Sequence, residues 1–455
     1  MTTLVNLTEP FDRVQERTMA PHATSQQQSH YLMSMAIIGI LFFIFGFMTW
    51  LNGPLTIFVK LAFHLDNVSA FLIPVAFYVS YFVLALPSAV VLKRTGMKRG
   101  MALGLFVMAI GAALFGQFID MHSYHGALGA LFVIGAGLSL LQTASNPYVS
   151  ILGPIESGAR RVAIMGICNK AAGALAPLVF GWLVLSGIGS FEQEVKAAPS
   201  PEAAQALLNQ FISRVYWPYM VMAAVMVLLA IWVARSSLPE IKPEGANQEI
   251  GATGTRRSIF SFPHLWLGVL CIFVYVGMEV MAGDAIGIYG QALGLPLDAV
   301  KHFTTYTMLA MLVGYFVGLV LIPRVISQQG YLAVSAVLGV LLAFGAWATH
   351  GYASVVFVAA LGFANAMMWP AIFPLAIKGL GDHTEFGSAL LIMGIVGGAL
   401  IPQIFVHVAE LIPMQLAFLL VMVPGYFYIL FYGLLGHRVG QNARPRVTHS
   451  ATATP

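Results

Sequence analysis

Charged residues are scarce in this chain and almost missing from its long apolar stretches. Its 455 residues include 22 Lys and Arg and 18 Asp and Glu, together 9% of the chain, whereas a soluble globular domain carries about 25%. Only Lys170, Glu279 and Asp284 lie well inside a hydrophobic stretch. A charge in hydrocarbon costs about 2.5–3.5 kcal/mol on insertion scales, so such residues normally face a polar cavity or a partner. The pattern excludes a soluble protein and points to a path through a membrane.

Several motifs that would indicate other functions are also missing. The two cysteines, Cys168 and Cys271, lie inside apolar stretches, so no disulfide framework is expected. No phosphate-binding Gly-Lys-Ser loop is present, which excludes an ATP-driven pump. No Ser, His and Asp arrangement at membrane depth suggests a hydrolase. His122 and His125 lack a convincing third metal ligand. We expect no enzyme, no cofactor, no metal and, with a net charge of +4, no nucleic-acid partner.

Long apolar segments dominate what is present, since 59% of the residues are hydrophobic. About 20 apolar residues span a bilayer as a helix, and the alternating segments of an outer-membrane barrel are absent. The sequence therefore predicts an all-α membrane protein with twelve transmembrane helices. Their expected ranges are 32–59, 69–92, 100–119, 126–150, 162–186, 217–235, 264–290, 303–322, 331–349, 353–378, 386–409 and 414–436.

The basic residues between these segments predict the orientation. With the N-terminus inside, seventeen fall on the cytoplasmic side and four on the other. The seventeen are Arg13, Arg17, Lys93, Arg94, Lys98, Arg99, Arg160, Arg161, Arg235, Lys242, Arg256, Arg257, Arg324, Lys378, Arg438, Arg444 and Arg446, and the four are Lys60, Lys196, Arg214 and Lys301. The positive-inside rule then places both termini in the cytoplasm. Residues 1–31 do not read as a secretory signal, and the first span is expected to be retained.

The chain reads as a duplicated unit of six helices. We expect an N-terminal tail at 1–31, one half at 32–235, a linker at 236–261, a second half at 262–437 and a C-terminal tail at 438–455. IMGI at 164–167 followed by GALAP at 173–177 reappears as IMGI at 392–395 followed by GALIP at 398–402. FGF at 45–47 aligns with VGM at 276–278, which pairs Gly53 with Asp284. Parallel halves with a site between them describe one major transporter architecture.

The seventh span carries two carboxylates and four glycines. Glu279 and Asp284 lie among Gly277, Gly283, Gly287 and Gly290; each glycine weakens a helix by about 1 kcal/mol relative to Ala. Broken helices bind substrates and ions in transporters. The two acids are candidate proton or Na⁺ sites, and the alternative is that neighbouring polar groups merely satisfy them.

Lys170 requires a partner because an unpaired ammonium at this depth is costly. Glu279 and Asp284 are the only acids at a similar depth. The sequence is compatible both with a permanent structural ion pair and with a pair that breaks during transport.

Amides and aromatic rings complete the candidate site. Amides donate and accept hydrogen bonds to hydroxyls, and aromatic faces suit sugar rings; each span amide has helix packing as its alternative role. The predicted substrate-binding residues are Trp50, Asn52, Gln142, Asn146, Asn169, Lys170, Asn365 and Trp369.

These motifs resemble those of a known family. The loop KRTGMKRG at 93–100 resembles that between spans 2 and 3 of the major facilitator superfamily, and LQTASNPY at 141–148 with LGPIES at 152–157 resembles its fucose–galactose–proton symporters. That family carries acids where this chain has Gly53 and Gln142, so its proton mechanism does not carry over onto spans 1 and 4. TWLNG at 49–53, Asn169-Lys170 and Gly283-Asp284 look most like the bacterial N-acetylglucosamine permease branch.

The resemblance implies the major facilitator fold and a monomeric sugar importer of the bacterial inner membrane. We expect proton-coupled uptake of N-acetylglucosamine by alternating access. A glucose/galactose carrier, with Na⁺ as a possible coupling ion, is the close alternative. A sugar sensor that does not transport and a drug exporter are the alternatives from other classes.

Overall fold

The computed structural model describes residues 25–152, 158–239, 258–322 and 324–441. Within these ranges every regular element is a helix, and twelve helices are long and apolar enough to cross a membrane. The all-α prediction with twelve spans is confirmed. The predicted tails (1–31 and 438–455) and linker (236–261) lie partly outside the described residues, and the domain boundaries placed there stay predictions.

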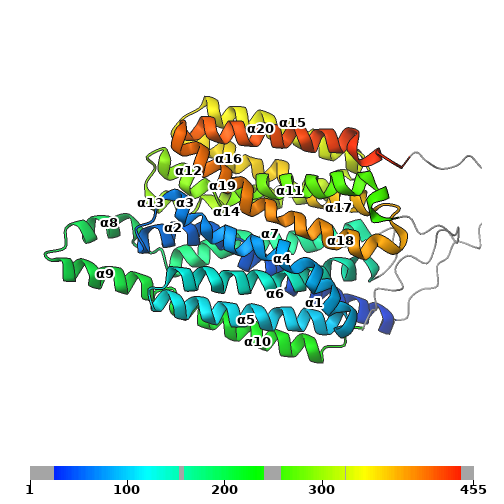
Figure 1. Cartoon of the computed structure of the whole chain (residues 1–455), viewed down its shortest axis with the longest axis horizontal. Coiled ribbons are helices and arrows are strands. Elements are labelled where there is room, and N and C mark those ends of the chain that lie inside the picture. Colours follow the sequence, from blue (N-terminus) through cyan, green and yellow to red (C-terminus); the bar gives the residue numbers. More distant parts are fainter. Residues whose placement is uncertain (1–24, 153–157, 240–257, 323, 442–455) are drawn as a thin grey trace, which may run out of the picture.

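The first six spans form one side of the bundle, drawn blue to green in Figure 1. They comprise α1 (Ser25–Thr49) with α2 (Asn52–Ala62), α3 (Asn67–Ala70) with α4 (Leu72–Thr95), α5 (Met97–Asp120), α6 (Tyr124–Ile151), α7 (Gly158–Leu183) and α10 (Tyr216–Arg235). Two further helices, α8 (Ile188–Lys196) and α9 (Pro201–Ser213), form a hairpin that projects from the bundle between the fifth and sixth spans (Figure 1).

The last six spans form the other side. They comprise α11 (Pro263–Gly283) with α12 (Ile286–Ala292), α13 (Leu297–Val300) with α14 (Phe303–Leu321), α15 (Gln328–Ala348), α16 (Gly351–Asn365) with α17 (Met368–Ile377), α18 (Thr384–Met393) with η6 (Gly394–Val396) and α19 (Gly397–Leu411), and α20 (Met414–Leu434). Short 3₁₀ turns occur at η4 (Ile259–Ser261), η5 (Gly381–His383) and η7 (Gly436–Arg438).

Two spans that meet between the halves are broken. Span 7 breaks after Gly283, where the glycine-rich sequence predicts a break. Span 1, expected as one segment over 32–59, breaks after Thr49 and restarts at Asn52. Pro54 explains the restart, because proline has no N–H to donate and is tolerated in the first turn of a helix. The Gly53-Pro54 pair is the sequence signal for this second break.

Matched glycine contacts support the duplication. A Cβ at Gly46 in span 1 would collide with the backbone of Asn169 in span 5, and a Cβ at Gly277 in span 7 would collide with Ile401 in span 11. Gly46 and Gly277 are the residues that the sequence alignment pairs. Equivalent helices therefore cross closely in each half, as a repeated unit requires.

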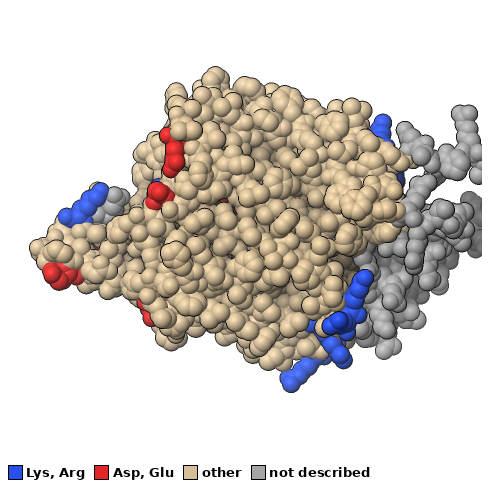
Figure 2. All heavy atoms as spheres, in the orientation of Figure 1, with Lys and Arg blue, Asp and Glu red and all other residues tan. Residues whose placement is uncertain are grey.

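The charged residues lie at the two ends of the bundle. Figure 2 shows an uncharged flank with blue side chains mostly at the end where the described chain begins and finishes, and red ones mostly at the opposite end. We call these the terminal end and the far end. Large apolar side chains such as Trp182, Leu228 and Val356 are more than 60% exposed on the flank, which suits a surface surrounded by lipid.

Two pairs of helices join the halves. α7 packs on α14, so span 5 meets span 8, and α4 packs on α18 and α19, so span 2 meets span 11. Spans 1, 4, 7 and 10 also face the middle, and together with these four spans they enclose a cavity.

Candidate functional site

A cavity of about 720 Å³, counting its open mouth, lies between the halves. Four spans from each half contribute to its wall. The lining residues are Phe42, Phe45, Thr49, Trp50, Tyr78, Tyr81, Gln142, Asn146, Val162, Gly166, Asn169, Lys170, Tyr275, Val276, Glu279, Tyr315, Trp369, Pro370 and Ile395. Mostly apolar walls with a few polar groups are typical of small-molecule sites.

A buried ion pair crosses the cavity from one half to the other. Lys170 Nζ on α7 lies 2.7 Å from Glu279 Oε1 on α11, and both residues are less than 10% exposed. The ammonium also lies 4.5 Å from the ring centroid of Trp50, a distance at which a cation is attracted to the indole face. The prediction that Lys170 pairs with a carboxylate of span 7 is confirmed, and Glu279 is the partner.

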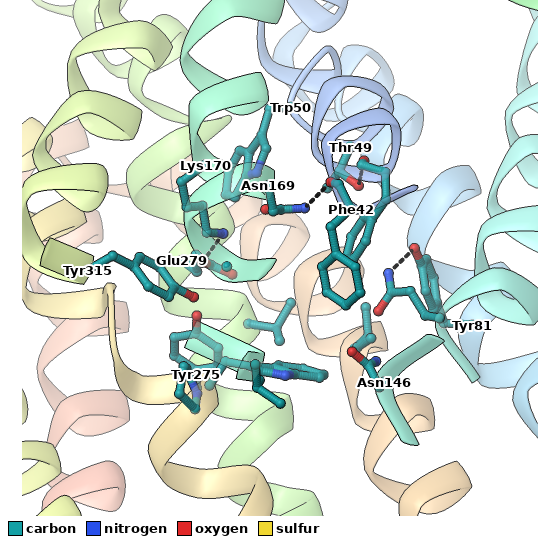
Figure 3. Close-up of a pocket in the computed structure, with 18 of the residues that line it drawn as sticks. Phe42, Thr49, Trp50, Tyr81, Asn146, Asn169, Lys170, Tyr275, Glu279 and Tyr315 are labelled. Carbon is teal, nitrogen blue, oxygen red and sulfur yellow. Dashed lines mark hydrogen bonds and ion pairs between the residues drawn. The ribbon is translucent and has the colours of Figure 1, made fainter. Parts of the chain in front are cut away.

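Two tyrosines stand beside this pair. Figure 3 shows the hydroxyls of Tyr275 and Tyr315 pointing toward one another, close to Glu279. Tyr275 precedes Glu279 by four residues, so both occupy the same face of α11. Two hydroxyls and an ion pair thus lie together in the cavity lining.

Three of the predicted amides, Gln142, Asn146 and Asn169, line the cavity. Gln142 Nε2 donates to Tyr81 Oη at 2.8 Å, and Asn169 Nδ2 donates to the Phe42 carbonyl at 3.4 Å (Figure 3). The amide oxygens of Gln142 and Asn169 can still accept a hydrogen bond, because the bonds just named use only donor hydrogens. Trp369, stacked on Phe373 at 5.7 Å, adds an apolar face.

Seven of the ten predicted site residues line the cavity, and Asn52, Asn365 and Asp284 do not. Asn365 is fully buried and accepts a hydrogen bond from Tyr426 at 2.9 Å, which is the helix-packing role. Asn52 is buried in the first turn of α2, beyond the break in span 1. Asp284 follows the end of α11 and is 1% exposed.

Asp284 packs against the other half of the protein. A Cβ at Gly53 would lie 3.1 Å from its Oδ1 and 3.2 Å from its Cα. Neither carboxylate oxygen accepts a hydrogen bond of normal geometry from any group in the described ranges, although the Gly53 backbone lies close. The acid therefore belongs to a contact between the halves on the far side of the cavity.

Further contacts close the far end. Lys60 Nζ on α2 donates to Asn67 Oδ1 at 2.6 Å and reaches across to Gln291 Oε1 on α12 at 3.2 Å. The hairpin helix α8 touches α13, where Gly189 meets Asp298. The cavity residues all lie between these contacts and the terminal end, so the far end of the molecule is closed.

Sequence reasoning found the two tryptophans of the cavity, Trp50 and Trp369, and missed its tyrosines and phenylalanines. Tyr78 and Tyr81 are spaced three apart on α4, which places both on one helix face, and Tyr275 precedes a predicted site residue by one turn. Tyr315 gives no comparable signal in the sequence. Among the described residues no group of three His, Cys, Asp or Glu side chains is placed to hold a metal, and His122 instead contacts Asn209.

Comparison with known proteins decides the family. The Major Facilitator Superfamily profile matches residues 38–402, most of the chain. This chain belongs to the Major Facilitator Superfamily. It is 35% identical over 422 residues to a protein of Brucella abortus named glucose/galactose transporter, covering 92% of this chain and 97% of that one. It is 30% identical over 389 residues to the Escherichia coli L-fucose-proton symporter, covering 84% and 88%.

A solved structure supports the same family assignment. A superfamily transporter, FucP, crystallised in an outward conformation, superposes with a TM-score of 0.71 at 28% identity, covering 89% of this chain and 98% of that chain. The fucose–galactose symporter resemblance is confirmed at this level. The N-acetylglucosamine branch receives no support from these relatives, whose names favour the glucose/galactose alternative.

Proposed function

We propose that this protein is a secondary active importer of a neutral hexose of the glucose/galactose type, driven by protons. The observation that carries the proposal is the cavity, where amides and tyrosine hydroxyls face indole rings and an ion pair at the meeting of the halves. Sugars need several donors and acceptors beside an apolar face. The names of the relatives, glucose/galactose transporter and L-fucose-proton symporter, agree with this chemistry.

Alternating access supplies the mechanism. The far end is closed here, whereas the related FucP crystal structure is described as outward. Rocking the halves about the span 5–8 and span 2–11 contacts would expose the cavity to each side in turn. Trp50, Gln142, Asn146, Asn169 and Trp369 would hold the sugar, and Lys170 and Glu279 would bridge the halves across it.

We further propose that the terminal end is cytoplasmic and the protein works as a monomer in a bacterial inner membrane. The basic side chains gathered at the terminal end (Figure 2) support the orientation. The cavity is complete within one chain, which supports the monomer.

Counterflow in proteoliposomes tests the substrate. Vesicles loaded with unlabelled glucose, galactose, fucose or N-acetylglucosamine are diluted into labelled glucose, with and without Na⁺. We expect glucose and galactose to drive entry of label equally well in both buffers. Counterflow with N-acetylglucosamine alone would restore the amino-sugar assignment. A requirement for Na⁺ would show that Na⁺ rather than the proton is the coupling ion. Sugar binding without counterflow would indicate a sensor.

A further inference from the structure

Tyr81 and Gln142 form a hydrogen-bonded pair in the lining of the cavity (Figure 3). Tyr81 lies on α4 in the second span and Gln142 on α6 in the fourth. The two helices cross closely at Gly135, where a Cβ would collide with the Phe77 carbonyl and the Ser80 hydroxyl. Gly135 and Gln142 are two helical turns apart and share a face of α6. The crossing therefore fixes the position of the pair.

Neighbouring aromatic rings hold Tyr81 in place. Its ring centroid lies 6.1 Å from that of Phe77 and 6.3 Å from that of Tyr78. Tyr81 is 1% exposed and Gln142 is 3% exposed. Side chains that are packed in this way lose little further freedom when a ligand binds, so a hydrogen bond to them contributes more of its energy to affinity.

The bond within the pair leaves a donor at one end and an acceptor at the other. Gln142 Nε2 donates to Tyr81 Oη at 2.8 Å, so the tyrosine oxygen is the acceptor in this bond. Within the described ranges, the Tyr81 hydroxyl hydrogen and the Gln142 amide oxygen have no further hydrogen-bond partner. A tyrosine hydroxyl can donate as well as accept, and an amide oxygen accepts. Both groups are therefore left for a ligand.

Two adjacent hydroxyls of a sugar satisfy both ends of the pair. Each sugar hydroxyl donates and accepts, so one can accept from Tyr81 while the next donates to Gln142. Because the two side chains are bonded directly to one another, the groups that satisfy them must be neighbours as well. A chain of hydrogen bonds in which each group both donates and accepts is strengthened by mutual polarisation. A single hydroxyl would leave one end of the pair unpaired, which is costly in a buried site.

We propose that Tyr81 and Gln142 together recognise a pair of adjacent hydroxyls on the sugar, with Tyr81 donating to one and Gln142 accepting from the next. This inference rests on the proposed function, which supplies the sugar. It adds Tyr81 as a residue that determines specificity, and it narrows the ligand from a neutral solute to one that carries a vicinal diol.

Competition for labelled glucose on the purified protein tests the pairing without requiring transport. The competitors are glucose and its 1-, 2-, 3-, 4- and 6-deoxy derivatives. In the wild type we expect deoxy sugars altered at two neighbouring carbons to bind about 5- to 150-fold more weakly than glucose, because each leaves one buried group unpaired. Tyr81→Phe should bring this ratio close to one at the first of these carbons, and Gln142→Met should do so at the second.

Tyr219→Phe is the matched control. Tyr219 is a buried tyrosine of α10 that packs on Phe115 and is not part of the cavity lining, so its variant should keep every wild-type ratio. Ratios that persist in Tyr81→Phe and Gln142→Met, or that collapse at carbons that are not neighbours, would overturn the proposal. Absence of glucose binding by the wild type would instead defeat the proposed function, so the two failures are distinguishable.

A second measurement uses only the wild type and applies even if the variants fail to fold. Fluorine in place of a hydroxyl accepts a weak hydrogen bond and donates none. At the carbon that faces Tyr81, the fluoro sugar should therefore bind more tightly than the deoxy sugar. At the neighbouring carbon, which faces Gln142, fluorine should bind no better than hydrogen. An equal response to fluorine at both carbons would overturn the assignment of donor and acceptor.

Discussion

At the scale of single residues, Lys170 shows how far the sequence alone can lead. Its depth in an apolar span predicts an acidic partner, and two acids at similar depth were available. Only the fold decides between them, because the choice depends on the rotation of α11 and on the break after Gly283. The same break explains why Asp284 leaves the cavity while Glu279 stays in it. Side-chain type predicted the chemistry, and backbone geometry assigned the roles.

The Lys170–Glu279 pair should dominate a double-mutant cycle. Lys170→Ala leaves a buried carboxylate without its partner, and breaking such a pair typically costs about 3–5 kcal/mol. Lys170→Ala combined with Glu279→Gln should recover much of this loss in thermal unfolding of the purified protein. The matched control is Lys170→Ala with Asp284→Asn, where we expect the two effects to add. Equal recovery in both cycles would contradict the exclusive pairing.

At the scale of helices, the sequence predicted that the spans are helical and that there are twelve of them among the described residues. It predicted only some of the positions at which these spans are interrupted. The break in span 7 follows from its glycines. The break in span 1 follows from Pro54, which has no N–H to bond to the preceding turn and therefore suits the first turn of a new helix. Span 10 also breaks, after Asn365, and Pro370 lies in the first turn of the segment that restarts at Met368, as Pro54 does in span 1. Both breaks therefore have a proline signal in the sequence, which the prediction of spans 1 and 10 as single segments did not use.

The Lys60–Gln291 contact should favour closure of the far end. Lys60 is partly buried and donates to Gln291 across the halves at 3.2 Å. Lys60→Met keeps the aliphatic stem and removes this bond, which we expect to weaken closure by about 1 kcal/mol, or roughly fivefold in the closed-to-open ratio. Ile57 on α2 is 2% exposed and packs toward Gly287 on α12. In a variant with Cys168 and Cys271 changed to serine, labelling of Ile57→Cys by a membrane-impermeant maleimide should therefore increase when Lys60→Met is added.

Lys98→Met provides the control, since Lys98 donates to the Ser236 carbonyl at 2.7 Å within one half. An unchanged labelling rate in Lys60→Met, or an equal increase in both variants, would contradict the role of the Lys60–Gln291 contact in closing the far end.

At the scale of the whole molecule, duplication and charge asymmetry were readable from the sequence, and the cavity was readable only in part. Gly46 and Gly277 align in the sequence and make equivalent crossings in the structure. The polar members of the cavity stand out against apolar spans, but its tyrosines and phenylalanines resemble ordinary core residues until the halves are assembled. Site residues that match their surroundings in polarity leave no signal in composition.

The orientation can be checked by fusions to alkaline phosphatase, which needs an oxidising compartment to form its disulfides. A fusion after Ala198, in the α8–α9 hairpin at the far end, should be active. A fusion after Leu380, which follows α17 at the terminal end, should be inactive. Activity in the reverse pattern would invert the proposed topology.

The ion pair across the cavity also bears on how the membrane voltage acts. A potential of 100 mV is worth up to about 2.3 kcal/mol for each elementary charge that crosses the field. Lys170 and Glu279 lie together as an ion pair and contribute no net charge, so the rocking of the halves moves this pair without that electrical work. The membrane voltage therefore acts on sugar uptake through the proposed coupling proton and not through the charged residues of the cavity.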